Sequence, residues 1–128
     1  MSEKKILVVD DEKAIISLMD QAFSRSGFIV AQAESAEAAI EILKQEKILV
    51  LFIDLNLPKM DGLELCKRVK KDNPISIIHA VTGYSSLFEL VDCIDAGFDD
   101  YFKKPVDIRI LIKAATEAFE KIERWTKK

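Results

Sequence analysis

The chain has 128 residues, of which 49% are hydrophobic and 32% are charged, and its formal net charge is −3. This length and composition predict one globular domain with a real hydrophobic core and exclude a disordered chain. The small negative charge gives no sign of a nucleic-acid-binding surface, so we expect no direct contact with nucleic acid. The sequence becomes acidic too early for a signal peptide, and no apolar run approaches the roughly 20 residues of a membrane span. We therefore expect a cytoplasmic protein that does not enter membranes.

Short apolar runs without polar alternation recur along the chain. Such runs are typical of parallel strands that are covered on both faces, because neither face needs polar side chains. We predict strands over residues 6–9, 28–33, 48–53, 75–81 and 100–102.

The segments between these runs have the apolar spacing of helices. Gly27 and Gly97 are placed to end the first and fourth helices, Ser35 and Asp107 are candidate N-caps of the second and fifth, and the Asn73–Pro74 pair ends the third. The predicted apolar stripes are Ile15, Leu18, Met19, Ala22 and Phe23; Ala36, Ala39, Ile40 and Leu43; Leu65, Cys66 and Val69; Leu87, Val91 and Ile94; and Ile108, Leu111, Ile112, Ala115, Phe119 and Ile122.

Five strands that alternate strictly with five helices predict an α/β fold with a doubly wound parallel sheet. Right-handed crossovers and the short chain favour the flavodoxin-like strand order 2-1-3-4-5. We expect a single domain over residues 1–128, with its core at about 5–122. Ligands of such sheets bind beyond the carboxyl ends of the strands, at the switch in strand order between strands 1 and 3.

Polar residues follow four of the predicted strands. Asp10, Asp11 and Glu12 follow the first strand, Asp54 ends the third, Thr82 follows the fourth and Lys104 follows the fifth. Each residue alone has an ordinary interpretation, as a helix cap or as a surface side chain. Because the carboxyl ends of parallel strands share one edge, their convergence argues for a functional site.

The residue types at this edge suit phosphoryl transfer. Three neighbouring carboxylates repel one another, and a divalent cation with oxygen ligands, Mg²⁺ or Mn²⁺, would remove the repulsion. The ammonium of Lys104 and the hydroxyl of Thr82 can contact phosphoryl oxygens. Asp54 would be the nucleophile that forms an aspartyl phosphate, and Gly83 would keep the approach to it open. Neither phosphate-binding glycine motif of nucleotide-binding proteins is present, so the donor should be a small molecule or another protein.

Four motifs resemble the receiver domain of two-component response regulators. They are "VVDDE" at 8–12, "DLNLPKMDG" at 54–62, "VTG" at 81–83 and "KP" at 104–105. Each motif is weak by itself, but all four occur in the family's order and on the expected strands. The resemblance extends over residues 6 to about 122.

The resemblance assigns a role to each matching position. It implies that Asp54 is the phosphoacceptor. It also implies that Asp11, Asp54 and the backbone carbonyl of Asn56 bind Mg²⁺, while Asp10 holds the metal, often through water. Thr82 and Lys104 would contact the phosphoryl oxygens.

The resemblance further implies a switch. The peptide bond before Pro105 would be cis. Tyr101 would turn inward when Thr82 moves toward the phosphoryl group, and the face made by helix 4, strand 5 and helix 5 would then change shape. Asn56 and Tyr84 are expected to tune attack by water. The domain would catalyse its own phosphorylation and dephosphorylation without being a conventional turnover enzyme.

The implied partners are other proteins. A histidine kinase or a phosphotransfer protein would supply the phosphoryl group. A downstream protein, or an output domain outside this chain, would read the switch. A homodimer through helix 4, strand 5 and helix 5 is a further expectation.

Two other functions compete with this interpretation. A small phosphatase of the haloacid dehalogenase type also uses an aspartate nucleophile. That family places a second acid two residues later, where this chain has Asn56, and its nucleophile usually follows the first strand. A receiver-like adaptor that no longer uses phosphate is the second alternative, and the complete polar set argues against it.

Four further side chains have structural interpretations. His79 lies inside an apolar run, which indicates a core histidine and not a phosphorelay histidine. Cys66 and Cys93 are expected to be free core thiols. Trp125 is either a packing cap on the last helix or part of a partner surface, and the sequence does not decide between them.

Overall fold

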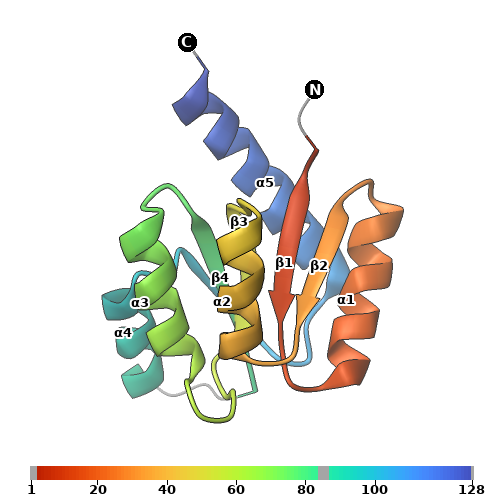
Figure 1. Ribbon diagram of the computed structural model, residues 1–128. Helices are drawn as coiled ribbons and strands as arrows, with labels where there is room; N and C mark the ends of the chain where they lie inside the picture. The colour runs from red at the N-terminus through yellow and green to blue at the C-terminus, as the bar shows by residue number, and fades with distance from the viewer. Residues whose placement is uncertain (1–2, 84–86, 128) are drawn as a thin grey trace.

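The structure is a computed structural model that describes residues 3–83 and 87–127, with the backbone alone at residues 87–89. Five strands alternate with five helices in this part of the chain (Figure 1). The strands are β1 (Lys5–Val9), β2 (Ile29–Ala33), β3 (Val50–Asp54), β4 (Ile77–Thr82) and β5 (Asp100–Lys103). The helices are α1 (Lys13–Arg25), α2 (Ala36–Gln45), α3 (Gly62–Asp72), α4 (Leu87–Ala96) and α5 (Ile108–Thr126).

The strands form one parallel sheet in the order β2-β1-β3-β4-β5, which confirms the predicted topology. The three central strands are buried along almost their whole length. This burial explains why their sequences are unbroken apolar runs. β3 and β4 each begin two residues later than predicted, at Val50 and Ile77.

Two hydrophobic clusters lie on opposite faces of the sheet. One packs alternate strand residues, such as Val8 and Phe52, against α1 and α5. The other packs their neighbours, such as Leu7 and Ile53, against α2 and α3, with Ala96 of α4 included. The sheet is therefore covered on both faces, as a doubly wound fold requires.

The predicted helix ends are confirmed. The side chains of Ser35 and Asp107 accept hydrogen bonds from backbone N–H groups in the first turns of α2 and α5. Gly27 and Gly97 have φ angles of 93° and 103°, which residues with a side chain rarely adopt, and they end α1 and α4.

Two predicted apolar stripes are partly wrong. Leu18 of α1 is exposed, and the buried stripe consists of Ile16, Met19 and Phe23. Val91 and Ile94 of α4 are also exposed, because the small residues Cys93 and Ala96 form its buried side. The side chain of residue 87 lies outside the described residues. Apolar spacing does not tell which of two adjacent stripes faces the sheet.

The predictions that His79, Cys66 and Cys93 are core residues are confirmed. His79 is buried, and Cys66 and Cys93 are buried thiols that form no disulfide. Trp125 is 72% exposed and borders a pocket of about 400 Å³ that also includes Ile122. Within the described residues, no helix combines the length and the apolar character needed to cross a bilayer.

Candidate functional site

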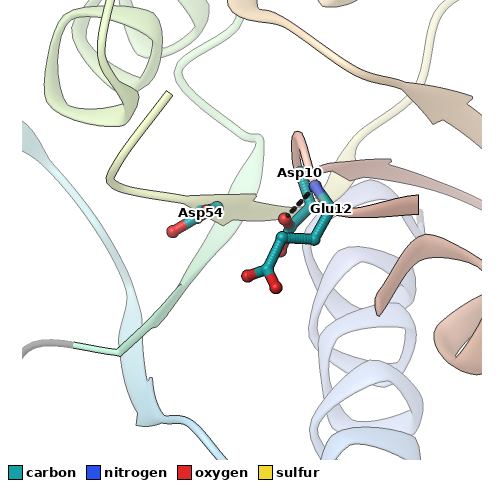
Figure 2. Close-up of side chains that lie close together, drawn as sticks. All are labelled: Asp10, Glu12 and Asp54. Carbon is teal, nitrogen blue, oxygen red and sulfur yellow. Dashed lines mark hydrogen bonds between the residues drawn. The ribbon is translucent and has the colours of Figure 1, made fainter. Parts of the chain in front are cut away.

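Three carboxylates meet at the carboxyl ends of β1 and β3 (Figure 2). Asp10 directly follows β1, Asp54 is the last residue of β3, and Glu12 precedes α1. One carboxylate oxygen from each residue lies within 4.8 Å of the other two. Asp10 and Asp54 are only 2% and 4% exposed, whereas Glu12 is exposed. The cluster lies between β1 and β3, where the strand order switches from one side of β1 to the other. Folds of this kind bind ligands at this switch point.

Gly62 allows the start of α3 to lie against the end of β3. Its backbone N–H donates to the carbonyl of Leu55 at 3.1 Å. A Cβ at this position would lie 2.5 Å from the carbonyl oxygen of Asp54 and 2.8 Å from the Cα of Leu55, so no larger residue fits without backbone movement. The close approach fixes the backbone that carries the Asp54 carboxylate.

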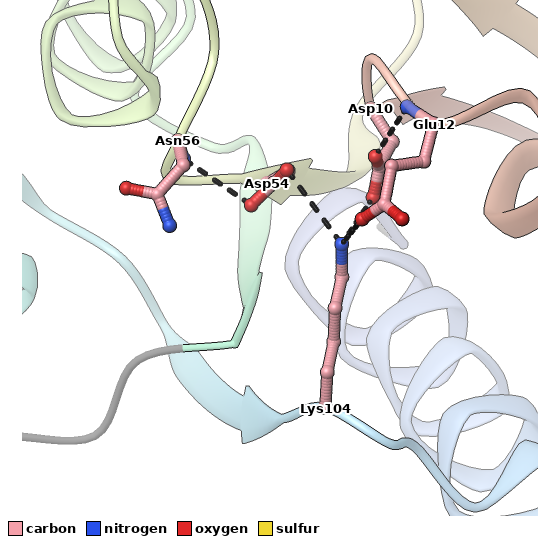
Figure 3. Close-up of polar contacts among 5 residues, drawn as sticks. All are labelled: Asp10, Glu12, Asp54, Asn56 and Lys104. Carbon is pink, nitrogen blue, oxygen red and sulfur yellow. Dashed lines mark hydrogen bonds and ion pairs between the residues drawn. The ribbon is translucent and has the colours of Figure 1, made fainter.

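Two similar hydrogen bonds orient the buried carboxylates (Figure 3). The Oδ1 atom of Asp54 accepts from the backbone N–H of Asn56 at 3.2 Å. The Oδ1 atom of Asp10 accepts from the backbone N–H of Glu12 at 2.9 Å. In both cases the side chain bonds to the backbone two residues later, which is a common local motif for aspartate. Each carboxylate keeps its second oxygen for other partners.

Lys104 reaches across from the end of β5 to these acids (Figure 3). Its Nζ atom lies 2.9 Å from Oδ2 of Asp10, 3.1 Å from Oε1 of Glu12 and 3.6 Å from Oδ2 of Asp54. The Lys104 backbone N–H donates to the carbonyl of Thr82, which ties the end of β5 to that of β4. The Lys104–Pro105 peptide bond is cis, the geometry that the resemblance implied.

The charges at the site are unbalanced. Burial raises the pKa of Asp54 above its usual range; the backbone hydrogen bond from Asn56 opposes this rise and the charge of Asp10 adds to it. Burial works to lower the pKa of Lys104, but the hydrogen bond and the charge of Asp10, together with Glu12, leave that pKa raised. Three carboxylates face one ammonium, so negative charge is in excess.

This arrangement fits a hard divalent cation. The cluster offers only oxygen atoms as ligands, which Mg²⁺ and Mn²⁺ prefer, and its surplus of negative charge favours a bound cation. The described residues place no histidine or cysteine in the cluster. The structure thus shows an acidic Asp/Glu/Asp cluster with the chemistry of a metal site.

Most of the predicted site residues lie at this edge of the sheet. Lys104 forms ion pairs with Asp10, at 2.9 Å, and with Asp54, at 3.6 Å. The backbone N–H of Asn56 donates a hydrogen bond to Asp54. Thr82 is the last residue of β4 and is completely buried.

Asp11 and Glu12 are neighbours at this edge of the sheet, and the role of Asp11 in metal binding stays a prediction. Asp11 is exposed and is not a member of the cluster, although its charge helps to raise the pKa of Asp54. The third carboxylate of the cluster is that of Glu12, which the sequence analysis places after the first strand without giving it a role.

The remaining predicted residues lie around the cluster. A Cβ added to Gly83 would meet no described atom within 4 Å, so the space beside the end of β4 is open. Tyr84 lies outside the described residues. Tyr101 of β5 is half-buried and borders a pocket of about 200 Å³ together with Leu90 and Ile94 of α4.

Comparisons with known proteins agree with this geometry. The family model described as "Response regulator receiver domain" matches residues 6–116. The crystal structure of a response regulator receiver domain protein (CheY-like) from Methanospirillum hungatei JF-1 is 34% identical, with a TM-score of 0.91 over 96% of this chain and 98% of that chain.

Two curated relatives are longer than this chain. The alkaline phosphatase synthesis transcriptional regulatory protein PhoP of Bacillus subtilis is 38% identical over 106 residues, which are 83% of this chain and 44% of PhoP. A cyclic di-GMP phosphodiesterase of Thermotoga maritima is 35% identical over 113 residues, which are 88% of this chain and 30% of that protein. The chain thus spans less than half the length of either relative. From the family match over most of its length, the chain belongs to the receiver domains of response regulators in two-component systems.

Proposed function

We propose that Asp54 of this receiver domain accepts a phosphoryl group in a Mg²⁺-dependent reaction. The observation that carries the proposal is the position of the Asp54 carboxylate. It is buried, its pKa is raised, it lies in a cluster with two further carboxylates, and it is 3.6 Å from the ammonium of Lys104. A carboxylate in these surroundings is poised for a partner that brings positive charge, and it can act as a nucleophile.

The metal would be held by the acids at the strand ends. The carboxylate cluster that contains Asp10 and Asp54 supports this proposal, and the resemblance adds Asp11 and the carbonyl of Asn56. When bound, Mg²⁺ or Mn²⁺ supplies positive charge that stabilises the phosphoryl oxygens in the transition state.

The chain's own residues carry the transfer. A carboxylate oxygen of Asp54 forms a bond to phosphorus while the bond between phosphorus and the donor's imidazole nitrogen breaks. The electron pair of that bond stays on the nitrogen, which is then free to take a proton. The Lys104 ammonium then forms an ion pair with one phosphoryl oxygen, and the Thr82 hydroxyl donates a hydrogen bond to another.

The same event would reach the face made by α4, β5 and α5. Thr82 ends β4, next to β5, and Tyr101 borders a pocket with exposed apolar residues of α4. We propose that movement of Thr82 lets Tyr101 turn inward and reshapes this face. A histidine kinase or phosphotransfer protein would act as donor in the cytoplasm. A downstream protein, an output domain or a second copy of the chain would bind the reshaped face.

The comparisons decide one of the two alternatives. The family match assigns the chain to receiver domains and not to haloacid dehalogenase phosphatases. A receiver-like adaptor that works without phosphate remains a distinct hypothesis, and phosphorylation itself distinguishes it from the proposed function.

The test is incubation with acetyl phosphate and Mg²⁺, followed by intact-mass spectrometry. We expect the wild type to gain one phosphoryl group, Asp54→Asn to gain none, and chelation of the metal to prevent the gain. Glu34→Gln is a matched control, because it removes an exposed acid that follows β2 at the same edge of the sheet. An unmodified wild type would favour the adaptor, and equal uptake by Asp54→Asn would exclude Asp54 as the acceptor.

A further inference from the structure

We infer that Glu12 is a positioning residue for phosphoryl transfer. Its carboxylate holds the ammonium of Lys104 outside hydrogen-bond distance of Asp54 until the phosphoryl group arrives. This inference rests on the proposed function of Asp54.

The side chain of Glu12 faces the site and not its own helix. Glu12 occupies the N-cap position of α1, where a side chain commonly accepts from the helix backbone, yet its side chain makes no such bond. The carboxylate is turned instead toward Asp10 and Lys104 (Figures 2 and 3). The bond from the Glu12 backbone to Asp10 fixes the turn from which the side chain extends.

The distances around Lys104 are unequal. Its ammonium is within hydrogen-bond distance of Asp10 and Glu12, at 2.9 and 3.1 Å. Its separation of 3.6 Å from Oδ2 of Asp54 exceeds the 2.7–3.2 Å of normal N–H···O bonds. The attraction of Lys104 to the carboxylates of Asp10 and Glu12 thus exceeds its attraction to the carboxylate of Asp54. Lys104 is near Asp54 without being bonded to it.

Removing the Glu12 charge would change this balance. Lys104 would then lie between one carboxylate on each side, Asp10 and Asp54, and would move toward Asp54. A direct bond from Lys104 would commit the oxygen that must attack phosphorus, and this bond would have to break before transfer. Because Glu12 is exposed, its hold on Lys104 is weak, and we expect a rate effect of about two- to fivefold.

Two measurements on Glu12→Gln test the inference. In crystals grown without divalent cations, we expect the Lys104 Nζ to lie about 2.9 Å from Asp54, within normal hydrogen-bond distance, instead of 3.6 Å. In phosphorylation assays with limiting acetyl phosphate and Mg²⁺, we expect uptake about two- to fivefold slower than in the wild type. The control Glu34→Gln, which removes the same charge at the same edge, should match the wild type.

A Lys104→Met background separates positioning from a direct effect of the Glu12 charge on the metal. If Glu12 acts through Lys104, Glu12→Gln causes no further slowing in this background. An unchanged rate in the single variant, or equal slowing in both backgrounds, would overturn the inference while leaving phosphorylation of Asp54 intact. A wild type that takes up no phosphoryl group would overturn the proposed function, and the inference with it.

Discussion

Two buried ionisable side chains lie on the neighbouring strands β3 and β4, and they differ in what surrounds them. His79 of β4 stacks on Phe52 of β3, with ring centroids 4.1 Å apart. Its Nδ1–H donates to the carbonyl of Leu51 at 2.9 Å, and burial lowers its pKa, so the ring stays neutral. Asp54 ends β3 among other acids, and burial raises its pKa.

The difference separates a core residue from a site residue. His79 has fixed partners and needs no charge, so the fold alone satisfies it. Asp54 shares one lysine with two other carboxylates and remains under-compensated. Burial of a polar group does not itself indicate function. The informative feature is the charge that the fold leaves unpaired, because a ligand can pair it.

The largest expected effect is a loss of stability in His79→Ala. The change leaves a cavity beside Phe52 and leaves the Leu51 carbonyl without its donor, so we expect the free energy of unfolding to fall by about 3 kcal/mol. Urea denaturation measures this change, and phosphoryl uptake by the folded fraction should persist. Leu18→Ala, which truncates an exposed side chain, should stay within about 0.5 kcal/mol of the wild type. A loss below 1 kcal/mol in His79→Ala would contradict a structural role for His79.

A smaller effect concerns pH. Because the pKa of His79 is lowered in the fold, the unfolded chain binds more protons as the pH falls below the ordinary histidine value of about 6.5. The free energy of unfolding should therefore decrease below this pH, by at most about 1.4 kcal/mol per unit. Denaturation curves of the wild type and His79→Gln at pH 7.5 and 5.5 isolate the contribution, since other groups titrate in both proteins. Parallel pH dependence in the two would refute it.

Much of the fold was predictable from the sequence because its signals are local. The unbroken apolar runs, the caps Ser35 and Asp107 and the terminal glycines depend on neighbours along the chain. The buried side of α4 was not predictable from spacing. Its small residues Cys93 and Ala96 pack inward, and this choice depends on the shape of the sheet and of α3.

The site was predictable to the level of strand ends and no further. The position of each polar residue after a strand placed Asp10, Asp54 and Lys104 at one edge. The choice between Asp11 and Glu12 as third carboxylate depends on the direction in which the chain leaves β1 and enters α1. Adjacent residues in a turn point different ways, and one sequence does not record which of them faces the site.

Asp54→Asn should have the opposite sign to His79→Ala. With its raised pKa, Asp54 retains a proton in the fold to higher pH than in the unfolded chain, so stability falls as the pH rises through that window. At neutral pH the charged carboxylate therefore destabilises the metal-free protein. Asparagine keeps the shape without the charge, and we expect the free energy of unfolding to rise by about 1 kcal/mol.

Mg²⁺ provides the control for this comparison. It should stabilise the wild type against thermal unfolding, since it binds the folded state, and should stabilise Asp54→Asn much less. A less stable Asp54→Asn protein in the absence of metal would show that Asp54 is adequately compensated by its neighbours, and the contrast with His79 would fail.

The smallest expected effect concerns Cys66, a third buried ionisable group. Burial raises the pKa of this thiol to about 12, as burial raises that of Asp54, but Cys66 lies in the apolar cluster between the sheet and helices α2 and α3. At pH 8 only about one molecule in 10⁴ would carry a thiolate, so iodoacetamide should not modify the folded protein at an appreciable rate.

An exposed thiol makes this absence of reaction meaningful. Ser17→Cys places a second thiol on the exposed side of α1, and mass spectrometry of digested fragments should find label there but not at Cys66. Denaturant should make both sites react. Rapid labelling of Cys66 in the folded protein would show that α3 opens readily. Cys66 would then be accessible to reagents despite its burial, as Asp54 must be to a ligand. Only the uncompensated charge of Asp54 would then separate the two residues.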